Sequence, residues 1–294
     1  MITILDGGMG AELIRRGAAA SGGLWSAQAL LDAPEAVVET HLDFIRAGAR
    51  IIITNSYSSI PSYLAKGGVE DRYEELTALA GQLARRAADE TKENVRVAGS
   101  LPPLSESYRP DLVPDDHQAR SIYEAMVIAL EPYVDLFICE TMSSIRESIN
   151  ACEAAKKEAL SRKIPVYVSW TLSEKPGAGL RSGETLRMAF EELATLGIDG
   201  FLCNCTAPEA IEAALKELRG WTDKPIGGYP NRVSAVPEGW TLDNELETER
   251  RVDLTPSVFV EFAKRCVENG ATLFGGCCGV GPEYIAALAE AFQE

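Results

Sequence analysis

The feature that most restricts the fold is a short apolar run that recurs eight times along the chain. Each run is followed by a small or polar cluster and then by a segment with helical periodicity. The runs do not alternate between apolar and polar residues, which is typical of parallel strands buried on both faces. This repetition predicts an α/β protein, a single (β/α)8 TIM barrel spanning residues 1–294, with its site at the C-terminal ends of the strands. The runs are Ile2–Leu5, Ala49–Ile53, Val95–Ala98, Val134–Cys139, Pro165–Trp170, Ile198–Cys203, Lys224–Gly228 and Ala271–Phe274.

Charge and composition exclude several classes of partner. The chain has 28 basic and 44 acidic residues, a formal charge of −16, so we expect no nucleic-acid partner. The first residues lack a signal peptide's basic region and apolar core, and no apolar run reaches the length of a membrane helix. Seven cysteines in such a chain indicate reduced thiols. We therefore expect a cytoplasmic protein that acts on small molecules; the sequence carries no signal for its oligomeric state.

Side chains capable of chemistry follow the predicted strands. Asp6 follows the first run, Glu140 the fourth, Cys205 the sixth, and Cys277 and Cys278 the eighth. The carboxyl ends of the strands form the active face of such a barrel, so we expect these five residues to meet at one mouth.

Two connections are longer than a barrel requires, Ser100–Gln118 and Pro230–Thr255. Loops of this length without helical periodicity are typical of lids or binding loops. Both follow predicted strands, so both are expected at the same mouth.

The remaining cysteines and the two histidines have simpler interpretations. His41 and His117 lie away from the strand ends, so we interpret them as ordinary surface or loop residues. A histidine-based nucleophilic triad is therefore not expected. Free cysteines are often buried, and the four expected in the core are Cys139, Cys152, Cys203 and Cys266.

Cys205, Cys277 and Cys278 are candidate zinc ligands. Adjacent cysteines on a strand point to opposite faces, but flanking glycines allow the chain to turn so that both can reach one ion. Three thiolates with an open fourth position suit a catalytic zinc site, which would deprotonate a thiol substrate. The spacing alone is not that of a zinc finger or ribbon. Incidental buried thiols and a redox-active vicinal disulfide therefore stay open as alternatives.

Asp6 and Glu140 have two interpretations. Each could be a solvated carboxylate or a helix N-cap after its strand, and residue type alone favours this. Alternatively, the two carboxylates hold a substrate ammonium group while backbone N–H groups near Gly7 and Gly8 hold its carboxylate.

The chain resembles the homocysteine S-methyltransferase family over nearly its whole length. The stretches that carry the resemblance are Leu5–Gly10, Leu24–Ala27, Thr54–Tyr57, Cys139–Thr141, Asn204–Cys205 and Gly275–Gly279. The resemblance implies that the three thiols bind Zn²⁺ and that Asp6 and Glu140 hold the amino group of homocysteine. It places Gly7 and Thr54 near the carboxylate of homocysteine, and implies that Asn231 fills the open zinc position before substrate arrives.

The resemblance also bears on the methyl donor. Members that use methylfolate and cobalamin carry further large domains, for which this chain has no room. Thr141 stands where the betaine-using branch has an aromatic residue, which disfavours betaine because a cation–π contact is lost. Leu24–Ala27 and Tyr57 look closest to the branch that uses S-methylmethionine or S-adenosylmethionine. Residues Leu101–Tyr108 depart from that branch's Gly-Pro-Tyr-Gly-like turn, which leaves the donor open.

The expected activity is therefore zinc-dependent methyl transfer from a sulfonium donor to the thiol of homocysteine, which forms methionine. The alternatives are methylation of another small thiol or selenol, the use of betaine as donor, and a non-catalytic zinc- or thiol-binding barrel.

Overall fold

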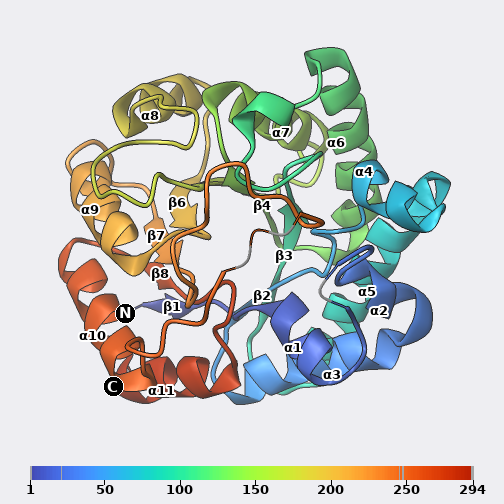
Figure 1. Ribbon diagram of the computed structural model, residues 1–294, viewed down its shortest axis with the longest axis horizontal. Helices are drawn as coiled ribbons and strands as arrows, with labels where there is room; N and C mark the ends of the chain where they lie inside the picture. The colour runs from blue at the N-terminus through green and yellow to red at the C-terminus, as the bar shows by residue number, and fades with distance from the viewer. Residues whose placement is uncertain (1, 21, 245, 247, 293–294) are drawn as a thin grey trace.

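The strands form one parallel sheet that curls into a nearly closed barrel, as predicted. The computed structural model describes residues 2–20, 22–244, 246 and 248–292. The strand order is β1-β8-β7-β6-β5-β4-β3-β2, and Leu5 bridges Ile51 in parallel where the two edge strands meet. Figure 1 shows the strands at the centre of a ring of helices. The strands are β1 (Thr3–Ile4), β2 (Ile51–Ile53), β3 (Arg96–Leu101), β4 (Leu136–Met142), β5 (Val166–Trp170), β6 (Gly200–Asn204), β7 (Ile226–Tyr229) and β8 (Leu273–Phe274).

Helices connect successive strands and cover the outside of the barrel. Proline in the first turn begins several of them, among them the helix that starts at Pro34, because the fixed φ of proline suits a helix start. The helices are α1 (Met9–Arg15), α2 (Ala27–Asp32), α3 (Pro34–Arg46), α4 (Pro61–Leu64), α5 (Tyr73–Asp89), α6 (Asp116–Leu130), α7 (Ile145–Glu158), α8 (Leu186–Thr195), α9 (Pro208–Arg219), α10 (Pro256–Glu268) and α11 (Pro282–Phe292). Short 3₁₀ segments are Ala65–Gly67, Glu70–Arg72, Pro110–Leu112 and Glu131–Tyr133. Within the described residues, no helix combines the length and apolar character needed to cross a membrane.

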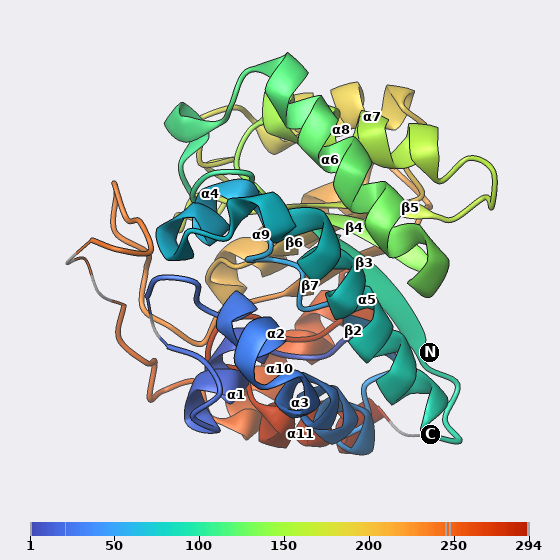
Figure 2. The same ribbon diagram turned by 90° about the vertical axis from the view of Figure 1, so that its right-hand side faces the viewer.

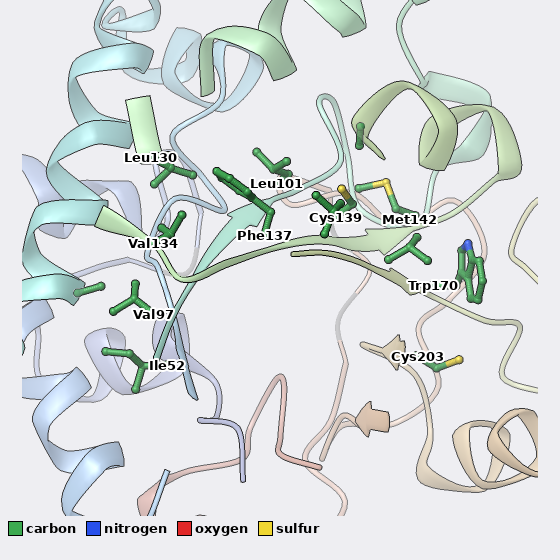
Figure 3. Packing of buried hydrophobic residues seen from close by; sticks show 14 of the residues in the cluster. Ile52, Val97, Leu101, Leu130, Val134, Phe137, Cys139, Met142, Trp170 and Cys203 are labelled. Carbon is green, nitrogen blue, oxygen red and sulfur yellow. The ribbon is translucent and has the colours of Figure 1, made fainter. Parts of the chain in front are cut away.

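Strand β4 shows how the barrel sorts its side chains. Successive strand residues point to opposite faces, and Leu136 and Ile138 belong to the cluster inside the barrel. Phe137 and Cys139 belong to the layer between strands and helices, which Figure 3 shows from close by. The inward series continues at Glu140, so the alternation of the strand places this carboxylate at the mouth. The core assignment of the four remaining cysteines is confirmed, since all four are buried.

His41 corrects one interpretation. It was expected on the surface, but helix α3 buries it completely, and burial lowers the pKa of its imidazole to about 3. Val37, His41 and Ile45 are four residues apart and share the inner face of the helix. The helical spacing predicts a buried position for His41, whereas its polar side chain suggests an exposed one. The spacing is the correct guide here. His117 is exposed, as expected.

Helix α7 begins over a buried carboxylate. Ser144 caps the helix by accepting a hydrogen bond from the Glu147 N–H. The Glu147 carboxylate accepts from both the N–H and the hydroxyl of Ser143, at 2.7 Å each. Burial raises the pKa of Glu147 from 4.5 to about 7, so the fold favours the protonated form.

We predict that Glu147→Gln raises the free energy of unfolding in neutral and alkaline solution. A raised pKa means that the folded state binds the proton more tightly, so this stabilisation is present below pH 4.5 and is lost as the pH rises through about 7. Glutamine keeps an oxygen acceptor for Ser143 and does not ionise. The free energy of unfolding of the variant should equal that of the wild type at low pH and exceed it by about 3 kcal/mol above pH 7. Chemical unfolding at a series of pH values checks this; a constant difference across the series would contradict it.

Candidate active site

A cavity of about 410 Å³ lies at the C-terminal ends of the strands. Eight of the nine sequence-predicted residues line it: Asp6, Gly7, Thr54, Tyr57, Glu140, Cys205, Cys277 and Cys278. Both long connections also contribute to its wall, through residues such as Tyr108 and Trp240. The connection after β7 crosses in front of the barrel in Figure 1 and projects from one end of the molecule in Figure 2. The expectation of one shared mouth is confirmed.

The three thiols lie together. The sulfur of Cys205 is 2.9 Å from that of Cys277 and 3.8 Å from that of Cys278, and all three sulfurs are within 4.8 Å of one another. Hydrogen bonds, first from Cys205 and then from Cys277, hold the pKa of Cys278 well below its usual value. One member of the cluster is therefore predisposed to be a thiolate, the form that binds metals.

This donor set fits a zinc ion. A tetrahedral site with Zn–S bonds of about 2.3 Å separates the sulfurs by about 3.8 Å. The distance between Cys205 and Cys278 already has this value, and Cys277 needs a shift of about 1 Å to reach it. All three thiols are free, so no disulfide competes for their sulfurs.

Local backbone conformation aims these sulfurs at one point. Cys205 directly follows β6 with φ at +54°, in the left-handed region, and this turns its side chain out of the alternation of the strand. Gly279, after the cysteine pair, has φ at +77°. A non-glycine residue in the left-handed region costs on the order of 1–3 kcal/mol. Strain at Cys205 is therefore part of the way the cluster is assembled.

Asp6 and Glu140 are both buried at the cavity wall, not solvated. The Asp6 carboxylate accepts from the Ile53 N–H at 2.8 Å, and Glu140 accepts from the Ser100 hydroxyl and, at 3.1 Å, from the Tyr229 hydroxyl. Burial raises the pKa of Glu140 to about 7. Burial, with the nearby charge of Glu140, raises the pKa of Asp6 well above its usual range. Neither carboxylate caps a helix; together they create a site that a cation would stabilise.

Gly7 and Thr54 lie at the same wall. A Cβ atom at Gly7 would lie 2.4 Å from the carbonyl oxygen of Val280, so only glycine fits there. The N–H of Gly8 donates to that same carbonyl, at 2.9 Å. It is therefore not free to hold a substrate carboxylate, contrary to the prediction for the N–H groups near Gly7 and Gly8. The Thr54 hydroxyl accepts from the Ser100 N–H at 3.0 Å, which ties the loop after β2 to β3.

Asn231 lies behind the cluster rather than on the cavity wall. Its side-chain oxygen accepts from the N–H of Cys278 at 3.2 Å, and the residue is buried. This contact fixes the turn that carries Cys278. To fill the open zinc position before substrate binds, the Asn231 side chain would have to give up its hydrogen bond with the Cys278 N–H.

Tyr108 and Trp240 are the residues that the sequence interpretation missed. The Tyr108 hydroxyl donates to the Cys205 sulfur at 3.2 Å. Its ring meets Trp240 edge to face, with centroids 5.5 Å apart, and the Arg181 guanidinium lies 4.8 Å from the ring centroid. The only signal for these residues was their place in the two long connections. Folding brings them together across the mouth.

A second aromatic pair lies on the same cavity. Trp25 and Tyr57 meet edge to face with centroids 5.8 Å apart, and both line the wall. The Tyr57 hydroxyl is hydrogen-bonded to Ser107, at 2.6 Å. The two aromatic pairs therefore line the same cavity as the acidic and thiol groups.

A half-buried carboxylate joins the loops above the cavity. Glu106, after β3, accepts from the Lys66 ammonium at 3.1 Å, from the Tyr63 hydroxyl at 3.3 Å and from the Leu242 N–H at 3.1 Å. Lys66 also pairs with Asp243 at 2.5 Å. We call these five residues the loop clasp. It holds the connections after β2, β3 and β7 to one another.

Comparison with known proteins agrees with this geometry. The family profile for homocysteine S-methyltransferase matches residues 3–292. The chain is 32% identical to homocysteine S-methyltransferase of Escherichia coli strain K12, over 98% of this chain and 94% of that one. It is 27% identical to selenocysteine Se-methyltransferase of Brassica oleracea var. italica, over 97% and 87%. The metallated crystal structure of the Escherichia coli homocysteine methyltransferase MmuM superposes with a TM-score of 0.79 at 30% identity, covering 98% of this chain and 96% of that one.

Proposed function

Because this chain belongs to the homocysteine S-methyltransferase family, we propose that it transfers a methyl group from a sulfonium donor to the thiol of homocysteine, forming methionine. One observation carries the proposal. Three thiols close enough to share one ion open onto the same cavity as two buried carboxylates. A thiol amino acid needs both features, one for its sulfur and one for its ammonium group.

Cys205, Cys277 and Cys278 are proposed to hold zinc. Bound there, zinc would favour the thiolate form of the acceptor, which is the nucleophilic form. The fit of the sulfur spacing supports zinc. The crystal structure of a related methyltransferase in a metallated form supports the presence of a bound metal. Tyr108 donates a hydrogen bond to one of the three sulfurs and Asn231 fixes the turn that bears another.

Asp6 and Glu140 are proposed to orient the acceptor. Two carboxylates buried side by side destabilise each other when both are charged, and an ammonium group between them removes that cost. Ser100 of β3 and Tyr229 of β7 both donate hydrogen bonds to Glu140 and hold it in place. Gly7 and Thr54 stay the proposed neighbours of the acceptor carboxylate, and both line the cavity.

The aromatic walls favour an onium donor. The faces of Tyr and Trp rings attract cations by about 0.5–2 kcal/mol, and the pairs Trp25–Tyr57 and Tyr108–Trp240 both border the cavity. In the proposed step the acceptor sulfur forms a new bond to the methyl carbon as the carbon–sulfonium bond breaks. The donor leaves as a neutral thioether, so the leaving group needs no proton.

We predict that Cys277→Ala abolishes zinc binding and methyl transfer while the barrel stays folded. Two thiols cannot supply the three protein ligands of a catalytic zinc site. Metal analysis, activity and circular dichroism on one sample check this. The matched control is Cys266→Ala, which removes a buried thiol from α10, away from the cavity. Turnover by a metal-free Cys277→Ala protein would refute the zinc assignment.

A second prediction concerns pH. Glu140 loses its charge below a pKa of about 7, so kcat/KM for homocysteine should fall as the pH drops through this value because the ammonium loses an anionic partner. Glu140→Gln should raise KM about 10- to 100-fold at pH 8, the loss of one charged hydrogen bond, without lowering zinc content. The wild-type advantage over the variant should shrink below pH 7.

Glu147→Gln is the control for this experiment. Glu147 is also buried with a pKa raised to about 7, but it belongs to α7 and does not line the cavity. Its substitution should leave the pH profile of kcat/KM unchanged. A Glu140→Gln protein with wild-type kinetics would remove Glu140 from acceptor binding.

The donor is tested by assaying methionine formation with S-methylmethionine, S-adenosylmethionine and betaine in parallel. We expect turnover with a sulfonium donor and little with betaine, since Thr141 provides no aromatic face. Turnover with betaine alone would refute the sulfonium assignment. Selenocysteine belongs in the acceptor panel, because one relative is named a selenocysteine Se-methyltransferase. Bound zinc with no product from any pair would favour a non-catalytic role.

A further inference from the structure

The side chain of Asn204 joins three strands at the mouth of the barrel. Asn204 ends β6, and its amide oxygen accepts from the Thr141 N–H of β4 at 2.9 Å and from the Ser169 hydroxyl of β5 at 2.7 Å. Its amide nitrogen donates to the Thr141 hydroxyl at 2.8 Å. Asn204 is fully buried, and it does not line the cavity. It therefore reaches across β5 to the end of a strand that is not its neighbour.

Both ends of this bridge lie beside strained backbone. Thr141 has φ at +60°, a conformation that a β-branched residue rarely adopts, and Cys205, next to Asn204, has φ at +54°. The pairing of β4 with β5 shifts register between Cys139 and Met142, the segment that contains Glu140. Backbone in such conformations persists only when surrounding contacts hold it. The three hydrogen bonds of Asn204 are such contacts.

We propose that Asn204 is a positioning residue that sets the Cys205 sulfur and the Glu140 carboxylate relative to each other. This inference rests on the proposed function, in which the first group binds zinc and the second binds the acceptor ammonium. Asn204 acts on Glu140 through Thr141, the next residue, and on Cys205 through the peptide bond that joins them. One buried amide thereby couples metal binding to acceptor binding.

If Asn204 positions both groups, one substitution at Asn204 should weaken both zinc binding and homocysteine binding. Asn204→Leu keeps the branched shape of the side chain and removes all three hydrogen bonds. Loss of a group that orients a metal ligand typically weakens metal binding about 10- to 100-fold. We expect the variant to lose zinc affinity by at least about tenfold, measured by competition with a chromophoric chelator, and to raise KM for homocysteine by a similar factor.

A second substitution separates the two arms of the bridge. Glycine adopts positive φ without strain, so adding Thr141→Gly to Asn204→Leu should restore KM to within about threefold of wild type. The same addition should leave zinc affinity low, because the strained backbone at Cys205 still lacks the contacts of Asn204 that hold it. A rescue of both constants, or of neither, would overturn the assignment of Thr141 as the link to Glu140.

Asn150→Leu is the matched control. Asn150 is a buried asparagine of α7 that accepts from Arg120 and donates to Asp116, remote from the cavity wall. Both asparagine substitutions remove buried hydrogen bonds, so we expect both to lower Tm. Asn150→Leu should leave zinc affinity and KM unchanged. If Asn204→Leu does not fold, Thr141→Val removes a single hydrogen bond of the bridge and should change both constants about threefold.

The wild type, measured in parallel, separates the two proposals. Absence of zinc binding or of methionine formation in the wild type would overturn the proposed function. Given an active wild type, an Asn204→Leu protein in which either constant stays within about twofold of wild type would overturn the positioning role of Asn204.

Discussion

The nearly closed ring of parallel hydrogen bonds is the constraint on which the rest of the molecule depends. Strand β1 pairs with β8, and the bridge between Leu5 and Ile51 completes the circle at β2. This pairing joins the two edge strands and gives every strand one face toward the barrel interior. Because all strands run in the same direction, the residues that follow them converge on one mouth. Carboxylates and thiols distant in sequence are neighbours for this reason.

Much of this arrangement could be predicted because it follows from periodicity. The apolar runs locate the strands, the two-residue alternation places Glu140 inward, and the position after a strand places Asp6 and Cys205 at the mouth. His41 shows where residue type misleads. Its polarity suggested the surface, whereas its spacing from Val37 and Ile45 placed it inside. Periodicity was the better guide.

Contacts between loops could not be predicted in this way. Tyr108 meets Trp240 across the mouth, although 132 residues separate them and neither belongs to a periodic element. Their approach depends on left-handed backbone at Tyr108 and on the loop clasp. The engagement of the Gly8 N–H by Val280 is equally invisible in sequence, because it depends on the turn after β8. Such contacts are decided by tertiary structure alone.

The site also shows how a stable barrel accommodates unfavourable local states. Two carboxylates with raised pKa values, clustered thiols and left-handed backbone at Thr141 and Cys205 each destabilise the fold. They are surrounded by strand hydrogen bonds and by large buried clusters on both sides of the sheet. The stability of this core offsets these costs and holds the residues of the mouth in conformations that they would not keep in isolated loops.

The loop clasp has a consequence for protein engineering. Since Glu106 binds groups from the connections after β2, β3 and β7 at once, the shape of the cavity entrance belongs to no single loop. A graft that changes the length of one connection displaces its partner groups on the other two and leaves a carboxylate without donors. A graft intended to change the methyl donor should therefore exchange all three connections together, including Lys66, Glu106 and Asp243.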